Sequence, residues 1–156
     1  MLPVLLALLL QSTTSTASTT ISGTLLPPQG LPAPDSAQVV LLPSEYAQMF
    51  NAEAQRRIDE YWETYKREFA ANKELFFKVP PVAYREALDR VIPRIKANPS
   101  SLIKTAAGGR FEFRGVPPGE YKIVAIGSIR NTDYVWTESV NVTTAPVSIV
   151  MKSHVP

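Results

Sequence analysis

The apolar residues of this 156-residue chain change their spacing twice, and that change restricts the fold more than any other feature. Residues 21–42 and 105–151 contain short apolar runs, broken by proline and glycine, that are typical of β-strands. Residues 43–104 between them repeat apolar side chains at the spacing of amphipathic helices. A sheet must therefore combine strands from both ends of the chain, with a helical segment inserted between them.

Six short runs carry the alternating or wholly apolar patterns of β-strands. The sharpest begins at Arg110 with Arg-Phe-Glu-Phe-Arg, which places Phe111 and Phe113 on one face before a Gly-Val-Pro-Pro-Gly turn. Residues 27–35 are rich in proline, which has no N–H group for a central strand, so a loop is predicted there. The predicted strands are residues 21–26, 37–42, 110–114, 120–126, 134–142 and 147–151.

Three of these segments together resemble the carboxypeptidase regulatory-like domain. They are residues 21–24, residues 37–42 and, most specifically, residues 109–123, where a strand, the Gly-Val-Pro-Pro-Gly turn and a tyrosine-led strand follow one another. The resemblance implies a prealbumin-like (transthyretin-like) antiparallel β-sandwich, forming a single domain over residues 21–152. It also implies an accessory or surface module without catalysis of its own. A starch-binding-like or adhesin sandwich would produce a similar pattern, and fold does not fix function.

Residues 43–104 stand where that family usually has a short loop. Their apolar stripes predict a helical hairpin, so the protein is expected to be mainly β and α+β overall. Ser44 is predicted to cap the first helix. The second is predicted to begin near Pro80-Pro81, because proline is tolerated in a helix's first turn, and Pro93 must kink or end it. The two stripes are Tyr46, Met49, Phe50, Ile58, Tyr61, Trp62, Tyr65 and Phe69, then Tyr84, Leu88, Val91, Ile92 and Ile95.

The position of the hairpin follows from two strands that are apolar on both faces, residues 39–42 and 123–126. A sandwich strand with one face in water should alternate, so the outer side of these strands is expected to be covered. We expect the hairpin to cover it, with Ile58, Trp62 and Tyr65 in the folding core. The competing interpretation is a projecting hairpin whose stripe binds another protein or a second copy.

The N-terminus has the pattern of a signal peptide. An apolar run of ten residues is too short to span a bilayer but fits a signal-peptide core, and a Ser/Thr-rich stretch follows it. Ser15 and Ala17 place small side chains where a signal peptidase reads them, so we predict cleavage after Ala17. Residues 1–20 are thus assigned to a signal peptide and linker. The mature chain is expected to be exported, to a periplasmic, cell-surface or secreted location, without a transmembrane segment.

The residue types available exclude several kinds of chemistry. The chain has no cysteine and a single histidine, His154, which argues against a zinc site. It shows no phosphate-binding glycine loop and no nucleophile–base–acid set, so we predict no cofactor, no metal and no catalysis. A net charge of +2 is too small to indicate nucleic-acid binding.

Candidate binding residues come from charge and from a loop. Residues 44–70 have a net charge of −2 and residues 71–104 of +4. We interpret this as attraction between two antiparallel helices; the alternative is a basic patch at Arg90, Arg94 and Lys96 that faces an anionic surface. A second group of candidates lies in a polar loop predicted over residues 128–133. Its members are Arg130, Asn131 and Asp133.

The aromatic residues of the first helix have two interpretations. Tyr61, Trp62 and Tyr65 would suit a sugar-stacking platform or a protein hot spot, although residues at helical spacing more commonly form core. The sequence therefore predicts an exported, non-catalytic interaction or structural module of the cell envelope that binds a protein or a glycan. The alternative is an accessory subunit of an enzyme or transporter complex whose catalysis lies on another chain.

Overall fold

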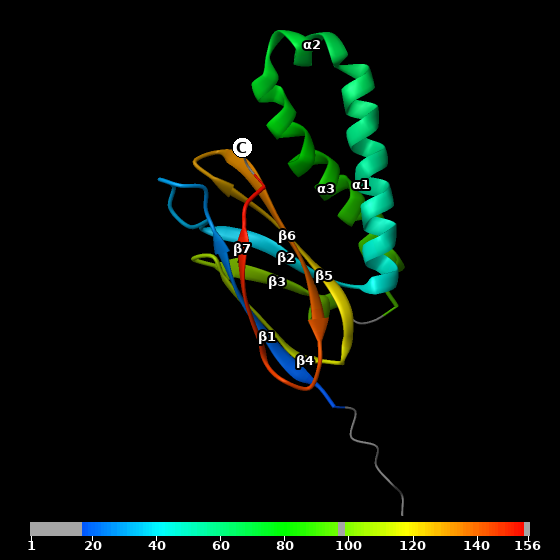
Figure 1. Cartoon of the computed structure of the whole chain (residues 1–156), viewed down its shortest axis with the longest axis vertical. Helices are drawn as coiled ribbons and strands as arrows, with labels where there is room; N and C mark the ends of the chain where they lie inside the picture. Colours follow the sequence, from blue (N-terminus) through cyan, green and yellow to red (C-terminus); the bar gives the residue numbers. More distant parts are fainter. Residues whose placement is uncertain (1–16, 97–98, 155–156) are drawn as a thin grey trace, which may run out of the picture.

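The computed structural model describes residues 17–96 and 99–154. Most of the predicted signal peptide therefore lies outside the described residues. Figure 1 shows a curled sheet at one end of the molecule and a long helical hairpin that extends beyond it. Within the described ranges, no helix combines the length and the apolarity needed to span a bilayer.

All six predicted runs form strands, and a seventh was missed. The strands are β1 (Thr19–Leu26), β2 (Ser36–Pro43), β3 (Ile103–Ala107), β4 (Arg110–Val116), β5 (Gly119–Ile129), β6 (Thr132–Val142) and β7 (Val147–Lys152). The unpredicted strand is β3, whose first two residues had been assigned to the helical insertion. Its sequence, Ile-Lys-Thr-Ala-Ala, does not alternate clearly, and it is a strand because it pairs along β2, from Ser36 opposite Ala107 to Val40 opposite Ile103.

The strands form one seven-stranded sheet in the order β6-β5-β2-β3-β4-β1-β7. The sheet curls into a near-barrel, and its edge strands meet where Trp136 bridges Ser153 and the His154 N–H donates to the Val135 carbonyl at 2.8 Å. The antiparallel prediction is wrong for one pair, because β1 and β7 run parallel. The two-layer sandwich stays a prediction, since the strands are joined in a single sheet.

The inside of the near-barrel holds several large buried side chains. Trp136 and Phe113 are fully buried there, and the Trp136 indole N–H donates to the Leu26 carbonyl at 2.7 Å. Gly23 lies opposite Phe111 in the β1–β4 register, and a Cβ at this glycine would lie 2.1 Å from the Phe111 ring. The absence of a side chain at Gly23 therefore leaves room for the Phe111 ring.

The outer face of β2 and β5 is also buried over residues 39–42 and 123–126, as their doubly apolar sequences predict, and the buried face extends to Val135 on β6. Because side chains alternate along a strand, one face of these strands carries Lys122 and the buried apolar residues in register with it. Lys122 contacts helix residue Asn51, so this is the face that the hairpin covers. The buried apolar residues of this face are Val40, Leu42, Val124, Ile126 and Val135.

The insertion is a helical hairpin, as predicted, with elements α1 (Ser44–Thr64), α2 (Lys66–Ala71), η1 (Lys73–Lys78), α3 (Val79–Val91), η2 (Ile92–Arg94) and α4 (Pro99–Leu102). Pro80 and Pro81 lie in the first turn of α3, and Pro93 follows its end. The predicted cap is wrong: α1 begins at Ser44 itself, and no side chain caps it. Strand β2 runs directly into the helix, so Pro43 occupies the cap position.

Only the near half of the hairpin, residues 44–60 and 83–91, packs on the sheet. Phe50 is fully buried and meets Tyr84 edge-to-face, with ring centroids 5.3 Å apart. Trp62 and Tyr65, expected in the core, are instead 41% and 45% exposed. Helix α1 is about 32 Å long at 1.5 Å per residue, and its buried residues all lie in its first half. The sheet therefore supports only that first half.

Candidate functional site

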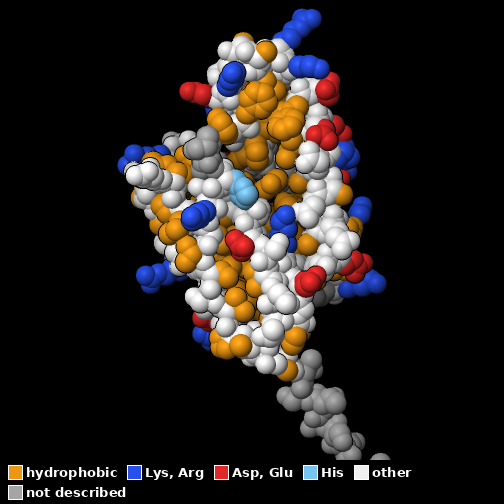
Figure 2. Space-filling model, in the orientation of Figure 1, with side chains coloured by type: hydrophobic (Ala, Val, Ile, Leu, Met, Phe, Trp, Pro, Cys, Tyr) orange, Lys and Arg blue, Asp and Glu red, His pale blue; other side chains and the backbone are white. Residues whose placement is uncertain are grey.

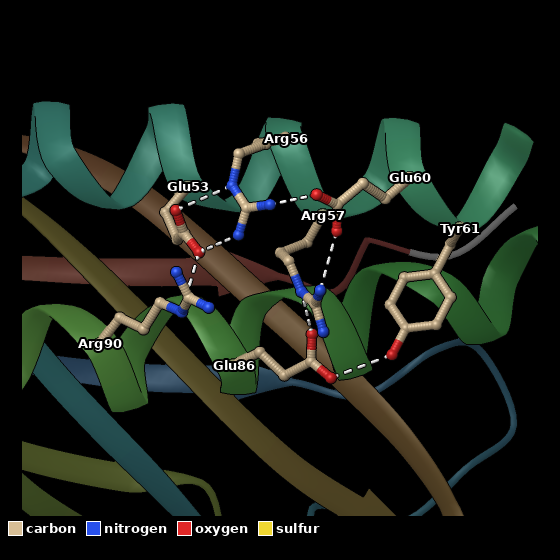
Figure 3. Close-up of polar contacts among 7 residues, drawn as sticks. All are labelled: Glu53, Arg56, Arg57, Glu60, Tyr61, Glu86 and Arg90. Atoms are coloured by element: carbon tan, nitrogen blue, oxygen red, sulfur yellow. Dashed lines mark hydrogen bonds and ion pairs between the residues drawn. The ribbon is translucent and has the colours of Figure 1, made fainter. Parts of the chain in front are cut away.

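The two arms of the hairpin are held together by polar side chains between α1 and α3 (Figure 3). The Glu86 carboxylate on α3 accepts hydrogen bonds from Arg57 at 2.5 Å and from the Tyr61 hydroxyl at 2.9 Å. The bond from Arg57 is the main cause that lowers the pKa of Glu86. The bond to Glu86 also raises the pKa of Tyr61, because the phenol must keep its proton to donate. This contact fixes the spacing of the arms near the middle of the hairpin.

A second contact lies closer to the sheet. Glu53 of α1 pairs with Arg56 at 2.6 Å on its own helix and with Arg90 of α3 at 3.2 Å. The hydrogen bond from Arg56 is the largest contribution that lowers the pKa of Glu53. Glu60 accepts from both Arg56 and Arg57 (Figure 3). The Glu53–Arg90 pair joins the acidic first half of the insertion to its basic second half, as the charge balance predicts.

The three predicted basic residues are only partly brought together. Arg90 and Arg94 line a shallow groove of about 260 Å³ together with Arg56, whereas Lys96 does not line it. The Arg90 guanidinium forms an ion pair with Glu53, which lines the same groove. The structure thus gives Arg90 a partner on the neighbouring helix. Its part in binding an anionic surface stays a prediction.

The second predicted group lies in a tighter turn than expected. Strands β5 and β6 continue to Ile129 and Thr132, so only Arg130 and Asn131 connect them. Both residues have positive φ, 50° and 64°, as a two-residue hairpin turn of type I′ requires. Asp133 accepts a hydrogen bond from Ser128 and pairs with Arg85 of α3 at 3.3 Å. The predicted polar loop is therefore a tight turn, and Asp133 links the hairpin to the sheet.

The far half of the hairpin, residues 61–82, carries a row of aromatic rings. Tyr65 stacks on Tyr61 at 6.2 Å and meets Phe69 at 6.4 Å between ring centroids. Phe76 of η1 stacks on Phe69 at 5.0 Å and meets Trp62 edge-to-face at 5.9 Å. Ring contacts of this kind hold the turn between the arms without help from the sheet.

Phe69 is buried in this row, but several of its neighbours are open to solvent. Five of the large exposed hydrophobic side chains belong to the far half: Trp62, Tyr65, Phe76, Phe77 and Val82. A groove of about 250 Å³, called here the aromatic groove, runs between the arms, and its lining includes Tyr65, Phe69, Leu75 and Val82. Figure 2 shows hydrophobic side chains gathered over this part of the hairpin, with charged side chains around its margin. Exposed apolar patches with a polar rim are common where proteins bind one another.

Sequence reasoning considered these aromatic residues and assigned most of them to the core. The helical period predicts that Phe50 and Tyr65 share a face of α1. It does not predict how far along the helix the covering sheet extends. One available signal was density, because residues 61–77 carry six aromatic side chains. The described residues hold no group of three or more side chains that could bind a metal ion.

Comparison with known proteins found no matching family model and no matching curated protein. Among solved structures, the major pilin subunit BcpA of Bacillus cereus aligns over 88% of this chain, with 8% sequence identity and a TM-score of 0.42. The full-length major pilin RrgB of Streptococcus pneumoniae aligns over 88%, with 13% identity and a TM-score of 0.34. This chain spans only about 30% of the length of either protein. Similarity at this level carries no functional conclusion.

Proposed function

We propose that this chain is an exported, non-catalytic interaction module that binds a protein partner through the far half of its helical hairpin. The observation that carries the proposal is the exposed aromatic groove on an element that projects beyond the sheet. Export rests on the signal-peptide pattern of residues 1–17. The resemblance to the carboxypeptidase regulatory-like domain supports a module without catalysis of its own.

The lining of the groove favours a protein over a glycan. A sugar needs polar groups beside an aromatic ring, but here the Tyr61 hydroxyl is already bonded to Glu86. Glu68 and Lys78 are the two charged residues among those lining the groove. Tyrosine and tryptophan dominate the hot spots of protein interfaces, where they bury large apolar surfaces. The groove lies between helical segments, so an amphipathic helix with apolar residues at i, i+3 and i+4 is the partner that fits.

The test is selection of helical peptides from a displayed library against the purified protein. We expect selected peptides to carry apolar residues at helical spacing and to lose at least about tenfold in affinity on Val82→Glu, because the substitution places a charge in the groove. The matched control is Val150→Glu, which changes a valine that is 59% exposed on β7. Peptides that bind both variants as tightly as the wild type would contradict the proposal.

A further inference from the structure

A second pocket lies at the root of the hairpin, where α1 leaves the sheet. It has a volume of about 430 Å³ and is called here the root pocket. Unlike the aromatic groove, it is lined mostly by residues with polar or charged side chains. The side chains that the argument uses are Gln48, Asn51, Glu120, Lys122, Ser139 and Asn141.

Three elements bring these residues together. In the β5–β6 register Lys122 lies opposite Ser139, and Glu120 lies opposite Asn141. Because alternate residues share a face, all four side chains lie on the side of the sheet that α1 covers. Gln48 and Asn51 are three residues apart on α1, and neighbours at this spacing share a helix face. The pocket is thus formed between one turn of helix and two cross-strand pairs.

Lys122 is the central group of the pocket. Its ammonium donates to the Asn51 amide oxygen at 2.5 Å and lies 5.5 Å from the centre of the Phe50 ring. Partial burial lowers the pKa of Lys122, since removal from water disfavours the charged form. Among the described residues it has no ion pair, although Glu120 lines the same pocket. The ammonium therefore retains hydrogen-bond donors and a positive charge without a counter-ion.

The surrounding side chains are free to bind. Within the described part of the chain, the side chains of Gln48, Ser139 and Asn141 make no hydrogen bond to another residue. Each amide offers donors and an acceptor, and the hydroxyl offers both. When it is ionised, the Glu120 carboxylate offers acceptors and no donor. Such a set suits the hydroxyl groups of a sugar, which donate and accept at the same time.

We propose that the root pocket binds an acidic sugar, whose carboxylate pairs with Lys122 and whose hydroxyl groups bond to Gln48, Ser139, Asn141 and Glu120. A charge-assisted hydrogen bond to Lys122 fixes the carboxylate, and it supplies the counter-ion that the lysine lacks. Glu120 repels a doubly charged phosphate more strongly than a singly charged carboxylate, and it accepts a hydrogen bond from a sugar hydroxyl. The site is independent of the aromatic groove and does not rest on the function proposed above.

The experiment is an NMR titration of the full protein with sodium glucuronate, with glucose and sodium acetate in parallel. Glucose presents hydroxyl groups without a carboxylate, and acetate presents a carboxylate without hydroxyl groups. We expect glucuronate at millimolar concentration to shift the amide signals of Gln48, Asn51, Ser139 and Asn141, and the other two compounds to bind more weakly. Equal binding of glucuronate and either comparison compound, or no shift at these residues, would overturn the proposal.

Four substitutions test which side chains contact the bound glucuronate. Lys122→Met keeps the side-chain length over Phe50 and should weaken glucuronate binding by about tenfold or more, because bonds to charged groups are strong. Lys152→Met removes the same charge from an exposed position on β7 and should leave binding unchanged. Asn141→Ala, at an exposed edge position, should weaken binding without affecting the fold. Val82→Glu should have no effect on glucuronate, which separates this site from the aromatic groove. Unchanged affinity in both Lys122→Met and Asn141→Ala would contradict the proposal.

Discussion

At the scale of single residues, shape and charge decide which positions tolerate change. Gly23 has no side chain because the Phe111 ring occupies that space. Arg130 and Asn131 adopt positive φ because a two-residue turn between twisted strands requires it. Asparagine is common in this conformation, whereas arginine is not, so the turn could not be located from residue types alone. At these positions the backbone or the packing requires a particular local geometry.

Gly23→Val should destabilise the fold, because its side chain would collide with the buried Phe111 ring and displace it. Overpacking of this kind costs about 1 to 3 kcal/mol of the free energy of unfolding. Urea denaturation measures the change, and Thr24→Val at the neighbouring, partly exposed position is the control. A Gly23→Val variant as stable as the control would show that Phe111 does not need the space.

At the scale of elements, the hairpin consists of a supported part and an unsupported part. The near half packs on the sheet and carries the ion pairs between α1 and α3, whereas the far half depends on its ring contacts. These pairs make the hairpin sensitive to acid. The pKa values of Glu53 and Glu86 are lowered in the folded state, so both carboxylates stabilise the hairpin while they are ionised.

The stability from these two carboxylates is present above the ordinary glutamate pKa of 4.5 and is lost as the pH falls through their lowered values. We expect the melting temperature to fall between pH 5 and pH 3, and to fall less in Glu86→Gln. Thermal melts by circular dichroism measure the difference, with Glu45→Gln as a control outside the network. An equal acid response in wild type and Glu86→Gln would show that the pair does not contribute.

The sequence predicted the element types better than their extent. The doubly apolar strands at residues 39–42 and 123–126 correctly indicated a cover, because a strand with one face in water should alternate. Strand β3 was missed because its pairing along β2 is non-local and its residues carry no alternation. The root pocket was missed for the same reason: Lys122, Ser139 and Gln48 are far apart in sequence and meet only through the β5–β6 register and the direction of α1.

At the scale of the whole molecule, the near-barrel acts as a base from which the hairpin projects. The base buries Trp136 and Phe113, whereas the far half leaves Trp62, Tyr65 and Phe77 in contact with water. Large apolar residues that do not serve the core are the basis of the proposed interaction function. The two halves of the hairpin must therefore respond differently to the loss of an aromatic ring.

The most direct measurement compares urea unfolding of Phe50→Ala and Trp62→Ala at matched protein concentration. Phe50 is fully buried between hairpin and sheet, so its truncation should cost about 3 to 5 kcal/mol of the free energy of unfolding. Trp62 is 41% exposed and does not contact the sheet core, so its truncation should cost at most about 1 kcal/mol. A Trp62→Ala variant destabilised as strongly as Phe50→Ala would place the far half in the folding core and contradict its role as an interaction surface.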